Sequence, residues 1–196
     1  MKITPGIYRS VSTVALPLAS LYLMWRSRRQ PAYRDYWDER FAWGTYPLRT
    51  ERPRVWIHAV SVGETNAAKP LLEAMLKSWP ECDVVLTHMT PTGREAGKRL
   101  VRLAPERIRQ CYLPYDAPYA VEKFVRQVRP TLGVIMETEV WPNLMHEMTA
   151  HGIPVVLANA RESEKSRAQA QKAIEVMGPA FGLALRPMRR CRRSSK

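Results

Sequence analysis

Residues 54–64, RVWIHAVSVGE, decide the fold that we expect for this chain. An apolar run of strand length leads directly into the turn SVGE, and a helical pattern follows. A second segment is organised in the same way, because the apolar residues 132–136 precede Glu137 and Glu139 and lead into another helical pattern. Strands that run directly into helices are the repeating unit of an α/β protein with a parallel sheet.

The rest of the chain continues this alternation. We expect strands at residues 55–60, 83–87, 109–112, 132–136 and 154–157. We expect helices at residues 64–77, 91–101, 118–128, 142–150 and 162–177. Thr90 before Pro91 is typical of a helix start, and Asp116 should cap the helix at 118–128. The fold class is therefore α/β, a Rossmann-like parallel sheet over residues 54–178.

Composition narrows the classes of partner. The chain has 196 residues, 45% of them apolar, which is enough for one domain with a real core. Lys and Arg number 31 against 18 Asp and Glu, a net charge of +13, so we expect an anionic partner. Six of these cations lie in the tail, residues 179–196, which we expect to be a solvated end. No zinc-finger, RRM or KH motif supports nucleic acid as that partner.

The N-terminal residues 1–30 contain a charge-free apolar segment between Arg9 and Arg26. This segment is shorter than the roughly 20 residues of a spanning helix, and Pro17 interrupts it. Its basic flank favours a helix anchored at an anionic membrane surface. An apolar helix packed on the domain and a signal peptide remain alternatives.

A juxtamembrane segment, residues 31–53, follows this anchor. Within it we expect an amphipathic helix over residues 33–43. Its charged residues should be solvated or available for recognition: Arg34, Asp35, Glu39 and Arg40.

The carboxyl ends of parallel strands meet at one edge of the sheet, where such folds bind ligands. Glu64 and Glu137 should both lie there and are candidates for acid/base chemistry. Gly63 should allow a tight turn and a close approach of ligand to backbone. The alternative interpretation of Glu64 is that it only complements the helix dipole.

Further polar residues follow other strands at the same edge. Hydroxyl groups and a helix start come from Thr90, Thr92 and Gly93, and Asn159 and Arg161 follow the last clear strand. Arg161 suits a phosphate or carboxylate. His58 and His88 fall on strands without metal-ligand spacing, so we expect hydrogen-bonded histidines of the core or cleft. The chain has no Walker loop, dinucleotide fingerprint or nucleophile elbow.

The three cysteines are scattered along the chain, which argues against a disulfide framework and for a reducing compartment. They are Cys82, Cys111 and Cys191.

Five of these motifs, in this order, resemble the transferases of 3-deoxy-D-manno-octulosonic acid (Kdo) in lipopolysaccharide assembly. The motifs are WIHAVSVGE (56–64), THMTPTG (87–93), YLPYD (112–116), METEVWPN (136–143) and NAR (159–161). The upstream segments PAYR (31–34) and WDER (37–40) are also similar to that family.

The resemblance implies the N-terminal, acceptor-binding half of a GT-B glycosyltransferase. It implies transfer of Kdo from CMP-Kdo to a lipid A precursor (lipid IVA) with inversion, at the cytoplasmic face of the inner membrane, without cofactor or metal. Glu64 would be the general base and Glu137 the second catalytic carboxylate. Substrate-binding residues would be Ser61, Gly63, Thr90, Thr92, Gly93, Asn159 and Arg161.

The chain also departs from the family pattern. The arginine-rich tail is unlike the family's continuation, and Glu162 stands where an apolar residue is expected. We therefore expect a truncated form without the donor-binding half. A non-catalytic, membrane-bound basic module that binds phosphorylated glycolipid is the alternative function, and DNA binding through the tail is a third hypothesis.

Overall fold

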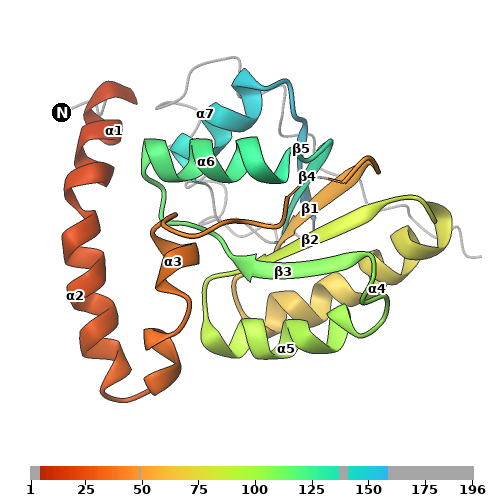
Figure 1. The fold of residues 1–196 in the computed structure, drawn as a ribbon, viewed down its shortest axis with the longest axis horizontal. Coiled ribbons are helices and arrows are strands. Elements are labelled where there is room, and N and C mark those ends of the chain that lie inside the picture. The colour runs from red at the N-terminus through yellow and green to blue at the C-terminus, as the bar shows by residue number, and fades with distance from the viewer. Residues whose placement is uncertain (1–4, 49, 137–140, 159–196) are drawn as a thin grey trace, which may run out of the picture.

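The computed structural model describes residues 5–48, 50–136 and 141–158. Its centre is a parallel sheet with the strand order β3-β2-β1-β4-β5 (Figure 1). The strands are β1 (Arg54–His58), β2 (Asp83–His88), β3 (Ile108–Tyr112), β4 (Leu132–Met136) and β5 (Val155–Ala158). The predicted Rossmann-like α/β fold is confirmed.

Helices cover both faces of this sheet (Figure 1). They are α4 (Val62–Ser78), α5 (Pro91–Val101), α6 (Pro118–Val128) and α7 (Pro142–Ala150). Side chains of β1 alternate between two cores: Ile57 packs with Leu72 beside α4 and α5, whereas Trp56 packs with Phe124 beside α6 and α7. Burial on both faces explains the apolar middles of β1, β2 and β4, whereas the edge strand β3 carries the exposed Arg109.

Most predicted elements agree with these bounds. Helices α5, α6 and α7 begin and end where the sequence predicted, because each has a proline in its first turn. Strand β1 ends at His58, two residues before the predicted end, since helix α4 already begins at Val62. The predicted helix at 162–177 and the tail at 179–196 lie outside the described residues.

The order in which strands are added to the sheet changes side at β1. The chain passes from β1 to β2 and β3 on one side and then crosses to β4 and β5 on the other. His58 of β1 pairs with Ile135 of β4, so the carboxyl ends of these two strands are neighbours. Open α/β sheets bind ligands at such a switch point. Helix α4, with Glu64 in its first turn, follows the end of β1, and Met136 at the end of β4 is followed directly by Glu137.

Four short elements precede the sheet: α1 (Pro5–Val14), α2 (Leu16–Ser27), the 3-10 helix η1 (Pro31–Arg34) and α3 (Trp37–Arg40). The predicted continuous helix over residues 33–43 is wrong. Asp35 is extended and Tyr36 is left-handed, with φ of 57°, so the chain turns between η1 and α3. The amphipathic pattern therefore reflects packing of two short turns.

Helix α2 packs on the domain with one face and leaves the other exposed. Leu16, Ala19 and Leu23 pack with Tyr33 and Phe41. The exposed face is also apolar and comprises Leu18, Leu21, Tyr22, Met24 and Trp25. Packing on the domain, one of the alternatives for this segment, is thus confirmed for one face only.

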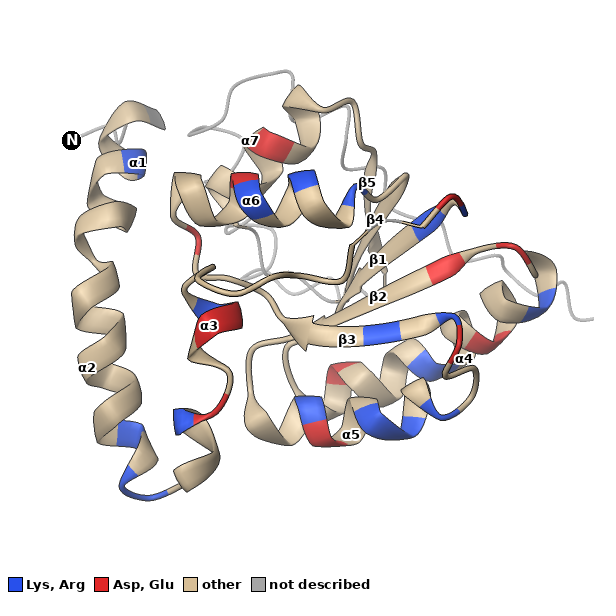
Figure 2. Cartoon of the chain, in the orientation of Figure 1, with Lys and Arg blue, Asp and Glu red and all other residues tan. Residues whose placement is uncertain are grey.

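In the described part of the chain, no helix by itself has the length and apolar character to cross a membrane. Helices α1 and α2 have the necessary length and apolar character only when they are taken together, and the pair is bent by 43°. Pro17 accounts for the break, because it has no N–H to donate to the preceding turn. Figure 2 shows basic residues at the C-terminal end of α2 and in the turn after it.

Candidate active site

The loop between β1 and α4 is closed by a reciprocal cap. Ser61 is the N-cap residue, and its Oγ accepts a hydrogen bond from the Glu64 backbone N–H at 3.4 Å. In return the Glu64 carboxylate accepts hydrogen bonds from the Val60 N–H at 2.7 Å and from the Ser61 hydroxyl at 3.0 Å. The sequence SVGE is therefore a capping box, in which a serine and a glutamate three residues later satisfy free donors at a helix start.

Glu64 is buried, with only 7% of its surface exposed. The cap holds its carboxylate at the carboxyl end of β1, in the first turn of α4, so the predicted position at this edge is confirmed. The side chain also serves that cap, so it has a structural part at the helix start, and whether it only complements the helix dipole stays untested. Its catalytic role stays a prediction.

Gly63 does not make the tight turn that the sequence predicted. It lies inside the first turn of α4, and a Cβ placed there would meet nothing closer than the Ser61 Oγ at 3.8 Å. The residue is exposed, so its missing side chain leaves the start of α4 open to solvent. The predicted tight turn was wrong, and the predicted close approach of a ligand to this backbone stays a prediction.

The start of α5 packs directly against this loop. Thr90 is its N-cap: the hydroxyl accepts a hydrogen bond from the Gly93 N–H and donates one to the Val60 carbonyl, both at 3.0 Å. A Cβ on Gly93 would come within 2.7 Å of that carbonyl, so only glycine fits here. Thr92 is exposed, and its Oγ1 lies 3.4 Å from that of Thr90. The structure thus brings the predicted residues at 61–64 and 90–93 together.

Two helix N-termini therefore lie side by side at the switch-point edge. Such N-termini carry partial positive charge and free N–H groups, which attract anions. Ser61 and Thr90 each accept a hydrogen bond from one backbone N–H of these helix starts. The exposed residues Gly63 and Thr92 border the part of the two helix starts that stays open to solvent. This edge suits an anionic or hydroxyl-rich ligand such as a phosphorylated sugar.

A buried charged cluster from α3 fixes α5 in place. Both Arg94 guanidinium nitrogens Nη1 and Nη2 donate to the Glu39 carboxylate, which also accepts the Tyr112 N–H at 2.7 Å. Arg40 is 1% exposed, donates to the Met89 carbonyl at 3.0 Å and has its Cζ 3.6 Å from the centre of the Tyr112 ring. The cluster therefore binds the chain at Met89, just before α5, and at Arg94, in the first turn of α5.

This arrangement corrects the prediction that Glu39 and Arg40 are solvated or available for recognition. Both are instead internal partners of residues about fifty or more positions later in the chain. The sequence analysis missed Arg94 altogether. A signal was available, because Arg94 occupies the first turn of a helix, where a cation opposes the helix dipole unless a carboxylate compensates it.

Two histidines are buried beneath the edge. The Nδ1 of His58 lies 2.9 Å from the Thr87 Oγ1, which also accepts the Trp56 indole N–H at 2.8 Å. The Nδ1 of His88 lies 2.9 Å from the Ala59 carbonyl, to which it must donate. Burial lowers the pKa of His58 to about 3, with a contribution from His88, and burial lowers the pKa of His88 to about 4. Both rings are neutral at physiological pH.

The expectation of hydrogen-bonded core histidines is correct for the Nδ1 of each ring. The Nε2 of His58 has no hydrogen-bond partner among the described residues, whereas the Gln110 side chain interacts with the His88 ring and favours its protonated form. The Nε2 of His88 lies against Gly97 of α5, where a side chain would collide with it. The described residues contain no group of His, Cys, Asp and Glu that could hold a metal ion.

Asp116 caps a different helix from the predicted one. Helix α6 begins at Pro118, and its N-cap residue Ala117 makes no side-chain cap. The Asp116 carboxylate instead accepts the Asn143 and Leu144 N–H groups at the start of α7, at 3.0 and 2.9 Å. It also accepts the Tyr8 hydroxyl at 2.9 Å, and burial raises the pKa of Asp116. These contacts tie α1 and α7 together.

Several predicted residues cannot be placed. Glu137 and Glu139, as well as Asn159 and Arg161, lie outside the described residues. Cys191 does too, whereas Cys82 and Cys111 are free and buried. The predicted convergence of Glu64 and Glu137 is therefore supported only by the adjacent ends of β1 and β4.

Comparison with known proteins supplies the family. Residues 35–188 match the family model described as 3-deoxy-D-manno-octulosonic-acid transferase (kdotransferase). A Bordetella pertussis protein named 3-deoxy-D-manno-octulosonic acid transferase is 43% identical over 171 residues, covering 83% of this chain and 39% of the relative. A protein of the same name from Haemophilus influenzae is 35% identical over 159 residues, covering 81% of this chain and 36% of the relative.

The chain thus spans less than two fifths of the length of these curated relatives. Among solved structures, a UDP-N-acetylglucosamine 2-epimerase matches with a TM-score of 0.46 and 13% identity, covering 64% of this chain and 40% of the epimerase. The family match rests on sequence and includes the THMTPTG, YLPYD, METEVWPN and NAR segments. We conclude that this chain belongs to the Kdo transferase family.

Proposed function

We propose that this chain forms the acceptor-binding half of a GT-B glycosyltransferase that transfers Kdo from CMP-Kdo to a lipid A precursor in lipopolysaccharide synthesis. The observation that carries the proposal is the position of Glu64. This carboxylate is held at the switch point of a Rossmann-like sheet, between two helix N-termini, in a chain of the Kdo transferase family.

In this proposal Glu64 is the general base. It takes the proton of the acceptor hydroxyl as the hydroxyl oxygen bonds to the anomeric carbon of Kdo, on the face opposite the phosphate. The bond from that carbon to the phosphate oxygen breaks, and its electron pair leaves with CMP, so the configuration inverts. Glu137, directly after β4, would stabilise the developing charge of the sugar.

The acceptor would lie along the open edge beside the two helix starts. Ser61, Thr90 and Thr92 offer hydroxyl groups, and the open backbone at Gly63 leaves room for the sugar, whereas Gly93 lets α5 pack closely on the Val60 carbonyl. Asn159 and Arg161 would hold an anionic group of substrate. The donor nucleotide belongs to a second half of the enzyme, and the reaction needs no cofactor.

The acceptor is a lipid, so we propose that the chain works at an anionic membrane surface, the cytoplasmic face of the inner membrane. Two features support this location. The exposed face of α2 is apolar, and the first acidic residue of the chain is Asp35. Basic, acid-free segments are attracted to anionic lipids.

The experiment uses Glu64→Gln, because Gln retains an oxygen that accepts the Val60 N–H but is not a base. A chimera in which this chain replaces the matching segment of the Bordetella pertussis relative is incubated with CMP-Kdo and a tetraacylated lipid A precursor. The readout is the gain in mass of the lipid. We expect Glu64→Gln to lower the rate about 10²- to 10⁴-fold, as for loss of a general base.

The matched control is Glu73→Gln, a half-exposed carboxylate on the same helix that pairs with Lys69. It should leave the rate unchanged. The proposed role of Glu64 is wrong if Glu64→Gln retains more than about a tenth of the wild-type rate.

The non-catalytic glycolipid-binding module remains the second candidate, because the Glu64 carboxylate is engaged in a cap that has a purely structural value. This second candidate function predicts that the chimera is inactive both with Glu64 and with the Glu64→Gln substitution. In that case this chain should still bind the tetraacylated lipid A precursor, and Glu64→Gln should not weaken the binding.

A further inference from the structure

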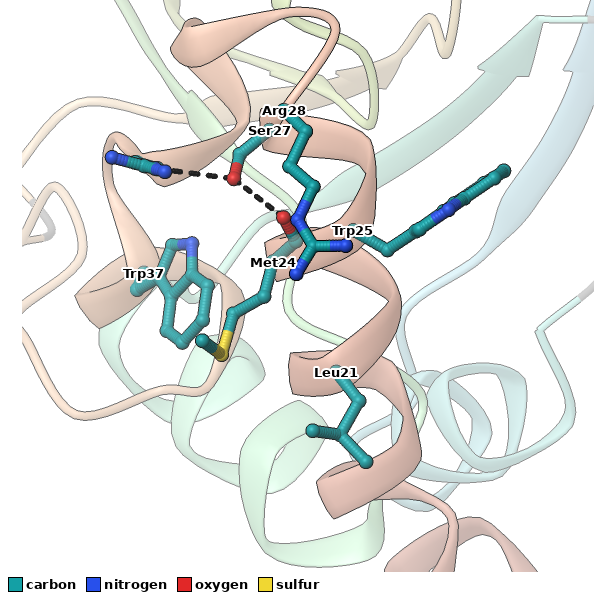
Figure 3. Close-up of a pocket in the computed structure, with 7 residues that line it drawn as sticks. Leu21, Met24, Trp25, Ser27, Arg28 and Trp37 are labelled. Carbon is teal, nitrogen blue, oxygen red and sulfur yellow. Dashed lines mark hydrogen bonds between the residues drawn. The ribbon is translucent and has the colours of Figure 1, made fainter.

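A groove of about 640 Å³ separates α2 from the segment that contains η1 and the start of α3 (Figure 3). Its lining residues belong to α2, the turn after α2, η1 and α3. Its lining consists of Leu21, Met24, Trp25, Ser27, Arg28, Arg34 and Trp37. None of these residues belongs to the candidate active site.

The floor of this groove is apolar and open to solvent. Leu21, Met24 and Trp25 have 61%, 57% and 52% of their surfaces exposed, although each is a large hydrophobic side chain. Trp37 forms the opposite wall and is held by a hydrogen bond from its Nε1 to the Tyr33 carbonyl at 2.8 Å. Exposed apolar surface of this kind marks a binding face.

The end of the groove nearest the C-terminus of α2 is basic. Arg34 Nε donates to the Ser27 hydroxyl at 3.1 Å, and that hydroxyl donates to the Met24 carbonyl at 2.7 Å, as Figure 3 shows. Arg28 and Arg34 are exposed, and neither forms an ion pair within the described ranges. Two guanidinium groups without a carboxylate partner suit a phosphate group, which each can bind through two N–H donors.

We infer that this groove binds one anionic glycerophospholipid of the bilayer, with an acyl chain along Leu21, Met24 and Trp37 and the phosphate between Arg28 and Arg34. Charge complementarity and the division into an apolar floor and a basic end argue for this occupant. The exposed Trp25 of α2, together with Trp37, fits the polar–apolar boundary of a membrane. The inference deepens the proposed membrane location and rests on it.

Two matched pairs of variants test the site in the full chain. Arg28→Gln removes a charge from the groove, whereas Arg9→Gln removes one from the same acid-free segment outside the groove. Met24→Gln makes the floor polar, whereas Leu18→Gln changes a residue of similar exposure that does not line the groove. All four positions are exposed or half-buried, so the fold should survive, and circular dichroism checks it.

Binding is measured by calorimetry with monomeric dihexanoylphosphatidylglycerol and, separately, with glycerol phosphate. We expect the lipid to bind one per chain and the free headgroup to bind at least about tenfold more weakly. Arg28→Gln and Met24→Gln should each weaken lipid binding about tenfold, and the two control variants should stay within about twofold. The inference would be overturned if a groove variant and its matched control lost lipid affinity equally. It would also be overturned if glycerol phosphate bound as tightly as the lipid.

Co-sedimentation with vesicles separates this inference from the proposed location. Vesicles of phosphatidylcholine with phosphatidylglycerol should retain the wild-type chain, and vesicles of phosphatidylcholine alone should retain less. If the chain binds neither kind, both the location and the groove are refuted. If all variants bind mixed vesicles and monomeric lipid as the wild type does, only the groove is refuted.

Discussion

Acidification should destabilise this protein before its carboxylates are protonated, because His58 and His88 are buried as neutral rings. Their pKa values are lowered to about 3 and about 4 by burial. The imidazole of an unfolded chain binds a proton near pH 6.5. Between pH 6.5 and about 4 the unfolded state therefore binds more protons than the folded state, so stability falls as the pH falls.

The magnitude follows from these values. At pH 5 an unfolded histidine is almost fully protonated, whereas the folded rings are almost entirely neutral. Lowering the pH from 7 to 5 thus costs about 2 kcal/mol for each ring, or about 4 kcal/mol for both. A typical domain has a stability of only about 5–15 kcal/mol, so the change is large.

Urea unfolding followed by circular dichroism at pH 7 and pH 5 measures this loss. His88→Gln retains a donor for the Ala59 carbonyl but does not titrate, so its stability should fall by only about 2 kcal/mol over the same range. His146→Gln, at an exposed position on α7, is the matched control and should fall by as much as the wild type. If His88→Gln loses as much stability between pH 7 and pH 5 as the wild type does, the argument from the buried rings is refuted.

Three further predictions concern stability and use the same urea assay at pH 7. Gly93→Ala should destabilise the protein by about 2 kcal/mol, because the added Cβ would meet backbone atoms. Gly63→Ala lies in open space in the first turn of α4 and should stabilise the protein by up to about 1 kcal/mol. Equal effects of the two substitutions would contradict the packing argument. Glu39→Gln should cost about 3 kcal/mol because it leaves the Arg94 charge without its partner, and a loss below about 1 kcal/mol would show that the pair is solvated. Asp116→Asn should cost about 2 kcal/mol, since its amide faces backbone donors of α7, and unchanged stability would exclude that cap.

The elements of the sheet were predictable because their signals are local. Apolar runs of strand length and a proline in the first helical turn act within a few residues, and α5, α6 and α7 begin where such prolines stand. The position of Glu64 at the sheet edge was predictable for the same reason. Parallel topology then follows from the alternation of strands and helices.

The contacts that support the site were not predictable, because they join residues far apart in the chain. The Glu39–Arg94 pair spans 55 positions, and Asp116 caps a helix 27 positions later. Gly63 and Gly93 look equivalent in the sequence, since each follows a strand and lies near a helix start. Only the packing of α5 on the β1–α4 loop distinguishes the crowded glycine from the open one.

The segment of residues 31–41 joins the groove beside α2 to the candidate active site. Its Tyr33 accepts a hydrogen bond from Arg26 of α2 at 3.1 Å, and Arg40, seven residues later, donates to the Met89 carbonyl directly before the N-cap Thr90. Every link in this series is a contact of a buried or half-buried side chain. Helix α2 is therefore held at a fixed position relative to the start of α5. The proposed function would need such a connection, because the depth of α2 at a membrane surface would set the height of the proposed catalytic edge above the bilayer.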